Sequence, residues 1–151
     1  MSIAQEVECL RKIPMFANVD IAKLKLLAFT SERVTYKPGE VLFHQDEMGT
    51  CAFIILSGEA EVEVRTPTGS LPVAVLGPSE IVGEIAILCD VPRTATVRAL
   101  SELDALCVPK EHFLQMIADF PQMALEIMRA LAHRLDMTTA RLREVLSGQG
   151  R

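Results

Sequence analysis

The stretch Ile81–Val97 reads IVGEIAILCDVPRTATV and interrupts a series of short β-rich runs. Within it, Ile85–Leu88 is a single apolar turn. Such a turn is too short for a helix with stability of its own, so we expect a surrounding β-barrel to hold it. Gly83 lets the backbone approach another group closely. The residues after it would open a helical turn, whose free backbone N–H groups form a site for an anion.

Arg93 follows Glu84 by nine residues and stands where a strand is expected to begin. An arginine inside an apolar barrel is costly unless another group neutralises its charge. In one interpretation Arg93 pairs with Glu84 or another acidic neighbour and is only structural. In the other, the guanidinium binds an anionic ligand, and Glu84 accepts hydrogen bonds from hydroxyl groups of that ligand. An anion joined to a hydroxyl describes a ribose phosphate, and the residues alone leave both interpretations open.

Short β-rich runs alternate with turn signals on both sides of this stretch. The runs are Val34–Tyr36, Val41–Phe43, Cys51–Leu56, Ala60–Val64, Leu71–Leu76, Ala95–Ala99 and Ala105–Val108. Strands of this length at near-regular spacing predict a jelly-roll-like β-barrel over residues 32–109, with the site segment at 82–97. In Ala60–Val64 the apolar residues alternate with Glu61 and Glu63, so we expect these two carboxylates to face water.

Helical periodicity frames the β-region. Residues 1–31 are expected to form N-terminal helices, one of them starting after Asp20 as a cap. After Pro109 the pattern predicts a short helix over Lys110–Ala118 and a long one from Pro121 to about Leu146. The whole chain, residues 1–151, is therefore expected to be one mainly β domain with flanking helices, in which residues 110–147 form C-terminal lid and dimer helices.

The long helix carries an apolar stripe at heptad spacing. Its members are Ala124, Met128, Leu131, Leu135, Thr138, Leu142 and Val145. A helix of that length would run about 39 Å, which exceeds what a lid over a small barrel needs. We therefore expect the stripe to contact a second copy of the chain and form a homodimer. The alternative is that the stripe packs entirely on its own barrel.

Composition restricts the function classes. The chain has 15 basic and 20 acidic residues, a net charge of -5, which disfavours binding to nucleic acid through an overall field. Its apolar runs are too short to span a bilayer, and Met1–Leu10 lacks the order of a secretory signal, so we expect a cytoplasmic protein. The four cysteines form no C-x-x-C pair and are interpreted as small apolar core residues.

A metal-dependent enzyme is disfavoured by the histidines. His44, His112 and His133 lie in different expected elements, without the paired spacing that a metal site on a barrel needs. We therefore expect no catalytic residues, no metal and no cofactor.

The segments Gly83–Leu88 and Pro92–Ala99 together resemble the phosphate-binding cassette of the cyclic-nucleotide-binding domain family. The segments Tyr36–Glu40, Phe53–Gly58 and Leu76–Pro78 also stand where that family has counterparts. The sequence departs from the family pattern at three positions. The family usually has glycine at the positions of Asp46 and Ser79 and an aromatic residue at that of Val82.

The resemblance implies a role for each matching residue. Arg93 would pair with the cyclic phosphate, and Glu84 would accept the ribose 2′-hydroxyl. Thr94 would place a hydroxyl near the phosphate or the base. Backbone contacts would come from Gly83, Ile85 and Ala86.

The segment Ala132–Thr139 resembles the dimer helix of the bacterial catabolite activator family. There, hydroxyl residues at the positions of Thr138 and Thr139 reach the adenine amino group, one from each subunit, and an arginine at the position of Arg134 comes near the ligand. This favours cyclic AMP. Thr94 often accompanies cyclic GMP in the wider family, so cyclic GMP stays an alternative, as do cyclic di-GMP and a degenerate module that kept the fold for protein contact.

The expected function is a regulatory sensor in which ligand changes the position of the C-terminal helix or the dimer state. An effector protein, which the sequence does not identify, would read that change. Only Ser147–Arg151 follow the predicted long helix, which is too little for a helix-turn-helix, so we expect no direct DNA binding.

Overall fold

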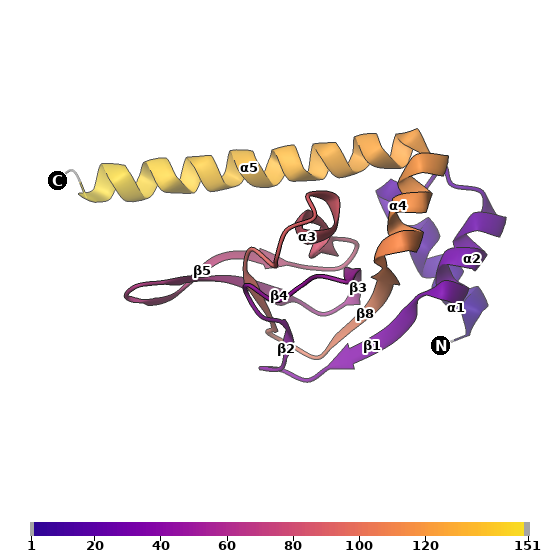
Figure 1. Ribbon diagram of the computed structural model, residues 1–151, viewed down its shortest axis with the longest axis horizontal. Helices are drawn as coiled ribbons and strands as arrows, with labels where there is room; N and C mark the ends of the chain where they lie inside the picture. Colours follow the sequence, from indigo (N-terminus) through magenta and orange to yellow (C-terminus); the bar gives the residue numbers. More distant parts are fainter. Residues whose placement is uncertain (1, 150–151) are drawn as a thin grey trace.

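The computed structural model describes residues 2–149, so Met1, Gly150 and Arg151 of the predicted domain lie outside the described residues. Two four-stranded antiparallel sheets form the centre of the molecule (Figure 1). One sheet has the order β1 (Glu32–Tyr36), β8 (Leu103–Pro109), β3 (Cys51–Ser57) and β6 (Ile81–Val82). The other has the order β2 (Val41–Phe43), β7 (Thr96–Ala99), β4 (Ala60–Thr66) and β5 (Gly69–Leu76). The predicted jelly-roll-like architecture with flanking helices is confirmed.

Strands β3 and β8 are buried on both faces. Ala52 and Ile54 of β3 pack into a cluster shared with the helices, whereas Phe53 and Ile55 pack into a second cluster between the two sheets. Strand β8 alternates in the same way. This double burial explains why Cys51–Leu56 reads as a continuous apolar run and not as an alternating one.

Strand β4 differs from the expectation. Glu61 and Glu63 do not face open water but are half-buried. The Glu63 side chain is only 15% exposed and accepts a 3.1 Å hydrogen bond from Nε of Arg98 on the neighbouring β7. The prediction was wrong because β4 lies between β5 and β7, so the arginine of the adjacent strand covers this carboxylate.

Helices α1 (Ile3–Arg11), α2 (Ile21–Thr30) and α4 (Lys110–Asp119) gather at one end of the roll, together with the 3-10 turn η1 (Pro14–Phe16) (Figure 1). The predicted cap is present, since the Asp20 carboxylate accepts a hydrogen bond from the backbone N–H of Ala22 at 3.2 Å. These helices bury an apolar cluster against the outer face of the β3 sheet. The short helix α3 (Glu84–Leu88) lies between the roll and the long helix α5 (Pro121–Gln149).

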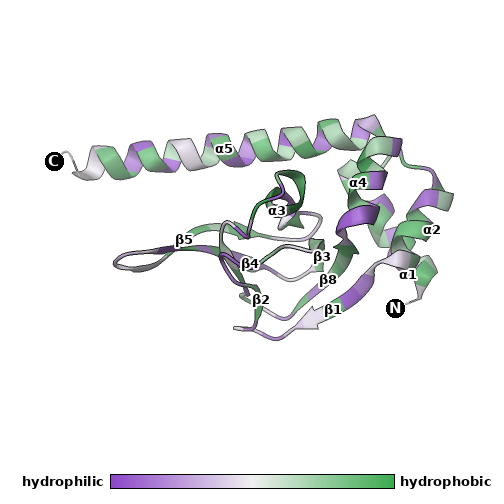
Figure 2. Cartoon of the chain, viewed as in Figure 1, coloured by the Kyte–Doolittle hydropathy of each residue, from purple (hydrophilic) through white to green (hydrophobic). Residues whose placement is uncertain are grey.

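Helix α5 is anchored only in its first half. Met123 and Ile127 are buried in the helical cluster, and Leu131 packs against it. The heptad stripe behaves differently: Met128, Leu135 and Leu142 are all more than half exposed. Apolar and polar residues alternate along this projecting helix (Figure 2). The alternative in which the stripe packs on its own barrel is therefore wrong for these positions.

None of the helices described over residues 2–149 combines the length and the apolar character needed to cross a membrane.

Two of the departures from the family pattern occupy left-handed backbone. Asp46 has φ 74° and Ser79 has φ 73°, which is a conformation that glycine adopts without a steric penalty. We expect Ser79→Gly to raise the free energy of unfolding by about 0.5–1 kcal/mol, measured by urea denaturation. Ser70→Gly in β5, where the backbone is not left-handed, is the control and should destabilise the protein. A neutral or destabilising Ser79→Gly would contradict the strain argument.

Candidate functional site

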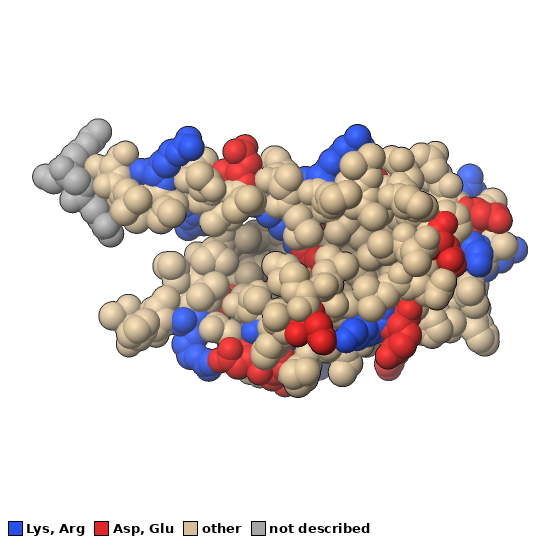
Figure 3. Space-filling view, turned by 45° about the horizontal axis from the view of Figure 1, so that its top comes forward, with Lys and Arg blue, Asp and Glu red and all other residues tan. Residues whose placement is uncertain are grey.

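A pocket that is partly open to solvent lies between α3, the β2 sheet and α5. In a space-filling view the surface is hollowed beneath α5, with charged atoms at the inner wall (Figure 3). Seven of the predicted site residues line this pocket: Gly83, Glu84, Ile85, Ala86, Arg93, Thr94 and Arg134. Apolar residues that the sequence analysis did not single out complete the wall: Phe43, Val62, Leu76, Val82, Ala95 and Val97.

Arg93 is the most constrained side chain of the pocket. It is only 4% exposed, and its guanidinium donates to the carbonyl oxygens of Gly83 and Cys51, each at 2.8 Å. The guanidinium also lies 4.0 Å above the ring of Phe43, as in a cation–π contact. A guanidinium has five N–H donors, so two carbonyl bonds fix its plane and leave other donors for a ligand.

The charge of Arg93 has no counter-ion among the residues that the structure describes. Among the ion pairs formed by residues 2–149, none involves Arg93. The structural interpretation, in which Arg93 pairs with Glu84, is therefore wrong, because Glu84 pairs with another residue. Neutral carbonyls compensate a buried cation only in part, and an anion would complete the compensation.

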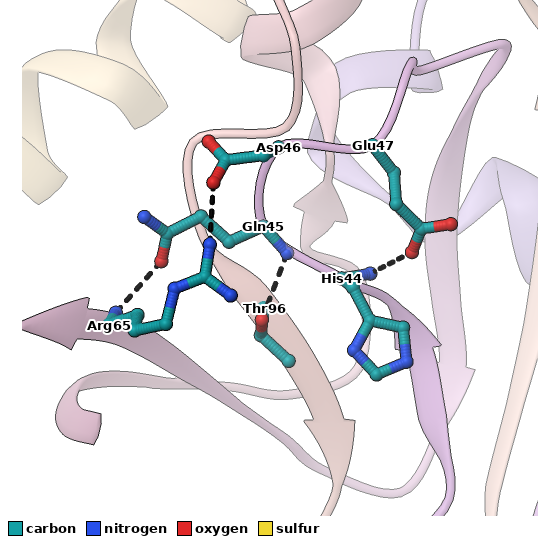
Figure 4. A network of polar contacts seen from close by, with 6 residues as sticks. All are labelled: His44, Gln45, Asp46, Glu47, Arg65 and Thr96. Atoms are coloured by element: carbon teal, nitrogen blue, oxygen red, sulfur yellow. Dashed lines mark hydrogen bonds and ion pairs between the residues drawn. The ribbon is translucent and has the colours of Figure 1, made fainter. Parts of the chain in front are cut away.

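The backbone of Arg93 is held by the loop His44–Gly49, which follows β2. The N–H of Arg93 donates to the carbonyl of Glu47 at 2.7 Å, and the carbonyl of Arg93 accepts from the N–H of Asp46 at 2.8 Å. The loop is tied in turn to β4, where Arg65 contacts both Gln45 and Asp46, and to Thr96 of β7 (Figure 4). Nothing in the residue types of this loop indicates from the sequence that it pairs with a residue so far along the chain.

Glu84 and Arg134 form a second polar part of the pocket wall. The Glu84 side chain is almost completely buried and accepts a 2.6 Å hydrogen bond from Nη1 of Arg134. Arg134 also donates to the carbonyl of Ile81, so this one side chain joins α5 to both ends of the segment around Gly83. Burial raises the pKa of Glu84 above its ordinary value of 4.5, although the nearby Arg134 charge opposes that shift.

The raised pKa of Glu84 predicts a pH dependence of stability. A group that binds its proton more tightly in the folded state stabilises the fold when it is protonated. The contribution of Glu84 is therefore fully present below its unfolded pKa of 4.5 and is lost as the pH rises through its folded pKa. We expect Glu84→Gln, which cannot ionise, to gain in unfolding free energy relative to the parent as the pH rises from 4.5 through the raised folded pKa of Glu84. Denaturation of both proteins across this range measures it; a constant difference would contradict the expected shift.

Gly83 is the N-cap of α3, has φ 82° and provides no side-chain cap for the first N–H groups of the helix. Ala86 is buried, whereas Ile85 is 40% exposed and Thr94 is exposed at the rim.

The two threonines of α5 lie outside the pocket. Thr138 is exposed, and its hydroxyl donates to the carbonyl of Arg134 in the preceding helical turn at 2.8 Å. Thr139 is half-buried and does not line the pocket. The structure of one chain thus brings together seven of the predicted residues and leaves these two apart.

The histidines, cysteines and carboxylates of residues 2–149 form no group of three that could hold a metal ion.

Comparison with known proteins identifies the family of the chain. The model of the cyclic nucleotide-binding domain matches residues 33–120, which include the whole roll from β1 onward and the pocket segment. The chain belongs to the cyclic nucleotide-binding domain family. As in a regulatory domain of this family, the matched region combines the β-roll with the segment that carries Arg93.

Relatives of this cyclic nucleotide-binding domain include regulators of two kinds. It is 28% identical over 140 residues to the CRP-like cAMP-activated global transcriptional regulator of Mycobacterium tuberculosis, covering 92% of this chain and 62% of the relative. It is 32% identical over 120 residues to the cAMP-dependent protein kinase regulatory subunit of Dictyostelium discoideum, covering 77% of this chain and 37% of the relative. The chain thus spans about three fifths or less of the length of these curated relatives.

Among solved structures, the Thermus thermophilus catabolite activator protein superposes with a TM-score of 0.73. The two share 27% sequence identity, and the match covers 89% of this chain and 63% of that one. The domain therefore shares the architecture of a catabolite activator over nearly all of its own length.

Proposed function

We propose that this domain binds cyclic AMP and acts as a regulatory sensor without chemistry of its own. The observation that carries the proposal is the nearly completely buried Arg93, which has no carboxylate partner within residues 2–149 and faces the pocket. A cyclic phosphodiester carries the single negative charge that this guanidinium lacks, and a bidentate contact suits two of its free donors. The names of the Mycobacterium and Dictyostelium relatives, both linked to cyclic AMP, support the choice of nucleotide.

The sugar would bind at Glu84. This carboxylate accepts a hydrogen bond from Arg134, so a ribose 2′-hydroxyl has to share or replace that contact. Arg134 is then a direct connection between ligand and α5. Binding of the hydroxyl at Glu84 would move the α5 side chain that now holds it, and α5 would shift with it around the break at Phe120, where α4 ends and α5 begins.

Cyclic GMP is the second candidate ligand, because Thr94 lies at the rim of the pocket with its side chain exposed. A parallel calorimetric titration with cyclic AMP, cyclic GMP, cyclic di-GMP and 2′-deoxy cyclic AMP tests the proposal. We expect binding of cyclic AMP and weaker binding of its deoxy analogue. If none of the four ligands bound, the sensor proposal would fail in favour of a domain that uses this fold for protein contact.

The exposed stripe of α5 supports a homodimer. Leu135 is 68% exposed and Leu142 is 57% exposed, and a second copy of the helix would bury both. In a parallel pair of helices, Thr138 and Thr139 of the partner could approach the nucleotide, although they lie outside the pocket of a single chain. An unidentified effector would read the helix position or the dimer state in the cytoplasm, and direct DNA binding by these residues is not expected.

Leu135→Glu is expected to convert the dimer to monomer, because two carboxylates would meet at the centre of the paired stripe. Sedimentation velocity with and without cyclic AMP measures this change. Met137→Glu is the matched control, since Met137 is 58% exposed but lies off the stripe, and it should leave the dimer intact. A parent protein that stayed monomeric in both conditions would remove the dimer proposal.

A further inference from the structure

Cys51 and Cys107 meet beside the pocket on neighbouring strands. The direct partner of Cys107 across the β3–β8 pair is Phe53, so Cys51 is its diagonal neighbour on the same face. The two Sγ atoms lie 2.8 Å apart, and both cysteines are half-buried and free. A disulfide needs about 2.05 Å between its sulfur atoms, and diagonal neighbours lie about 7–8 Å apart, so closing the gap requires a local adjustment of the two strands as well as of the side chains. Both cysteines pack against the core cluster between the two sheets, as expected, and they also contact each other.

Arg93, which supplies the positive charge of the proposed anion site, also contacts this cysteine pair. The carbonyl of Cys51 accepts a hydrogen bond from Nη2 of Arg93 at 2.8 Å. The same guanidinium rests on the ring of Phe43, and that ring stacks on Phe53 at a centroid distance of 5.9 Å. The positive charge of Arg93 thus lies next to Cys51.

We propose that Cys51 and Cys107 form an oxidisable dithiol, which low-molecular-weight disulfides of the glutathione class convert to an intrachain disulfide, and that nucleotide in the pocket slows this reaction. The second half of the proposal rests on the proposed function, whereas the first half does not. The Cys51 thiolate attacks one sulfur of the oxidant and releases a thiolate. Cys107 then loses its proton and attacks the Cys51 sulfur of the mixed disulfide, which releases the second thiolate. The two leaving thiolates take up the two protons, so the oxidant is reduced by two electrons to two thiols.

The order of attack follows from the local interactions. A hydrogen bond from the Cys107 thiol, assisted by the charge of Arg93, lowers the pKa of Cys51 to about 7. The same hydrogen bond raises the pKa of Cys107, which is the donor. Cys51 is therefore the nucleophile and Cys107 the resolving thiol.

A phosphate bound at Arg93 would neutralise the charge that favours the Cys51 thiolate. We expect the pKa of Cys51 to rise when an anion occupies the site, because the charge of Arg93 is one of the interactions that lower it. The thiolate fraction at neutral pH then falls, while the intrinsic reactivity of the thiolate rises slightly. The net expected slowing is about two- to fivefold at about pH 7. The slowing should disappear at about pH 9.5, where the thiolate form dominates in both states.

The experiment uses the full chain with Cys9→Ser and Cys89→Ser, which removes the two other thiols. The protein is treated with oxidised glutathione, and the products are quenched and mapped by peptide mass spectrometry. We expect a Cys51–Cys107 cross-link with the loss of two hydrogen atoms. The further substitution Cys107→Ser should stop the reaction at a glutathione adduct on Cys51. A product without the cross-link would overturn the modification site.

The coupling is measured by the rate of cross-linking with cyclic AMP, with adenosine and with neither. Cyclic AMP should slow the reaction at neutral pH, and adenosine, which lacks phosphate, should not. If calorimetry shows that cyclic AMP binds but the rate is unchanged, or the slowing persists at high pH, the electrostatic coupling is wrong. If cyclic AMP does not bind while the cross-link forms, the proposed function fails and the dithiol site stands.

Discussion

Arg93→Leu is expected to weaken cyclic AMP binding by at least about thirty-fold, equivalent to roughly 2–5 kcal/mol, in a calorimetric titration. The reason is that Arg93 supplies the only cation buried in the pocket as described for residues 2–149, and its plane is fixed by the carbonyls of Gly83 and Cys51. Leucine keeps part of the apolar contact with Phe43 but offers neither charge nor donors. The substitution should therefore reduce the affinity for cyclic AMP more than it changes the stability of the fold.

Stability separates this explanation from a structural one. Arg93→Leu removes a buried cation that has no counter-ion within residues 2–149, which opposes the loss of its two carbonyl hydrogen bonds, so the free energy of unfolding should change less than the free energy of binding. Arg129→Leu, on the exposed surface of α5, is the matched control and should change neither quantity much. Parent-like affinity in Arg93→Leu would refute the proposed phosphate contact, and a large loss of stability would indicate that Arg93 acts as part of the core.

Gly83→Ala is expected to lower both stability and affinity. Gly83 has φ 82°, and a methyl group added there would lie 2.4 Å from Nη1 of Arg93. The left-handed backbone alone costs a non-glycine residue about 1–2 kcal/mol. Displacing the guanidinium should disturb at least one charge-assisted hydrogen bond, worth about 1.5–3 kcal/mol, which corresponds to about a tenfold to hundredfold loss of affinity.

Gly39→Ala isolates the backbone contribution. Gly39 has φ 90°, close to that of Gly83, but an added methyl group there meets no atom within 4 Å. Gly39→Ala should therefore reduce the free energy of unfolding by an amount similar to the backbone cost at Gly83, measured by urea denaturation. Its affinity for cyclic AMP should stay at the parent value. Equal loss of affinity in both variants would mean that strain, and not contact with Arg93, explains the effect of Gly83→Ala.

Much of the fold could be predicted because its signals are local. The strands were indicated by the spacing of apolar side chains, and the start of α2 was indicated by the carboxylate of Asp20 as a cap. The break before Pro121 follows from the geometry of proline. Each of these signals depends only on residues that are close together in the sequence. Strand β6 was not predicted, because two residues are too few to show the alternation of a β-strand. The burial of Glu63 was not predicted, because its partner Arg98 belongs to β7, and the sequence does not show that β7 lies next to β4.

The candidate site could be predicted as a set of residues but not as a set of contacts. Spacing and resemblance singled out Glu84, Arg93 and Arg134, which the structure places around one pocket. Their partners could not be predicted from the sequence. Arg93 is bound by backbone carbonyls, which every residue possesses, and Glu84 is bound by a residue fifty positions away. Long-range pairings of this kind depend on how the sheets and α5 pack, and no local pattern encodes them.

The division of α5 into a buried and a projecting part has a geometric consequence. If α5 turns about the break at Phe120, Arg134 lies roughly 20 Å from this pivot along the axis and Ser147, in the projecting part, lies roughly 40 Å from it. A rigid helix therefore roughly doubles at Ser147 a displacement made at Arg134. An ångström of movement beside the sugar would thus reach the far tip as a shift large enough for another macromolecule to discriminate.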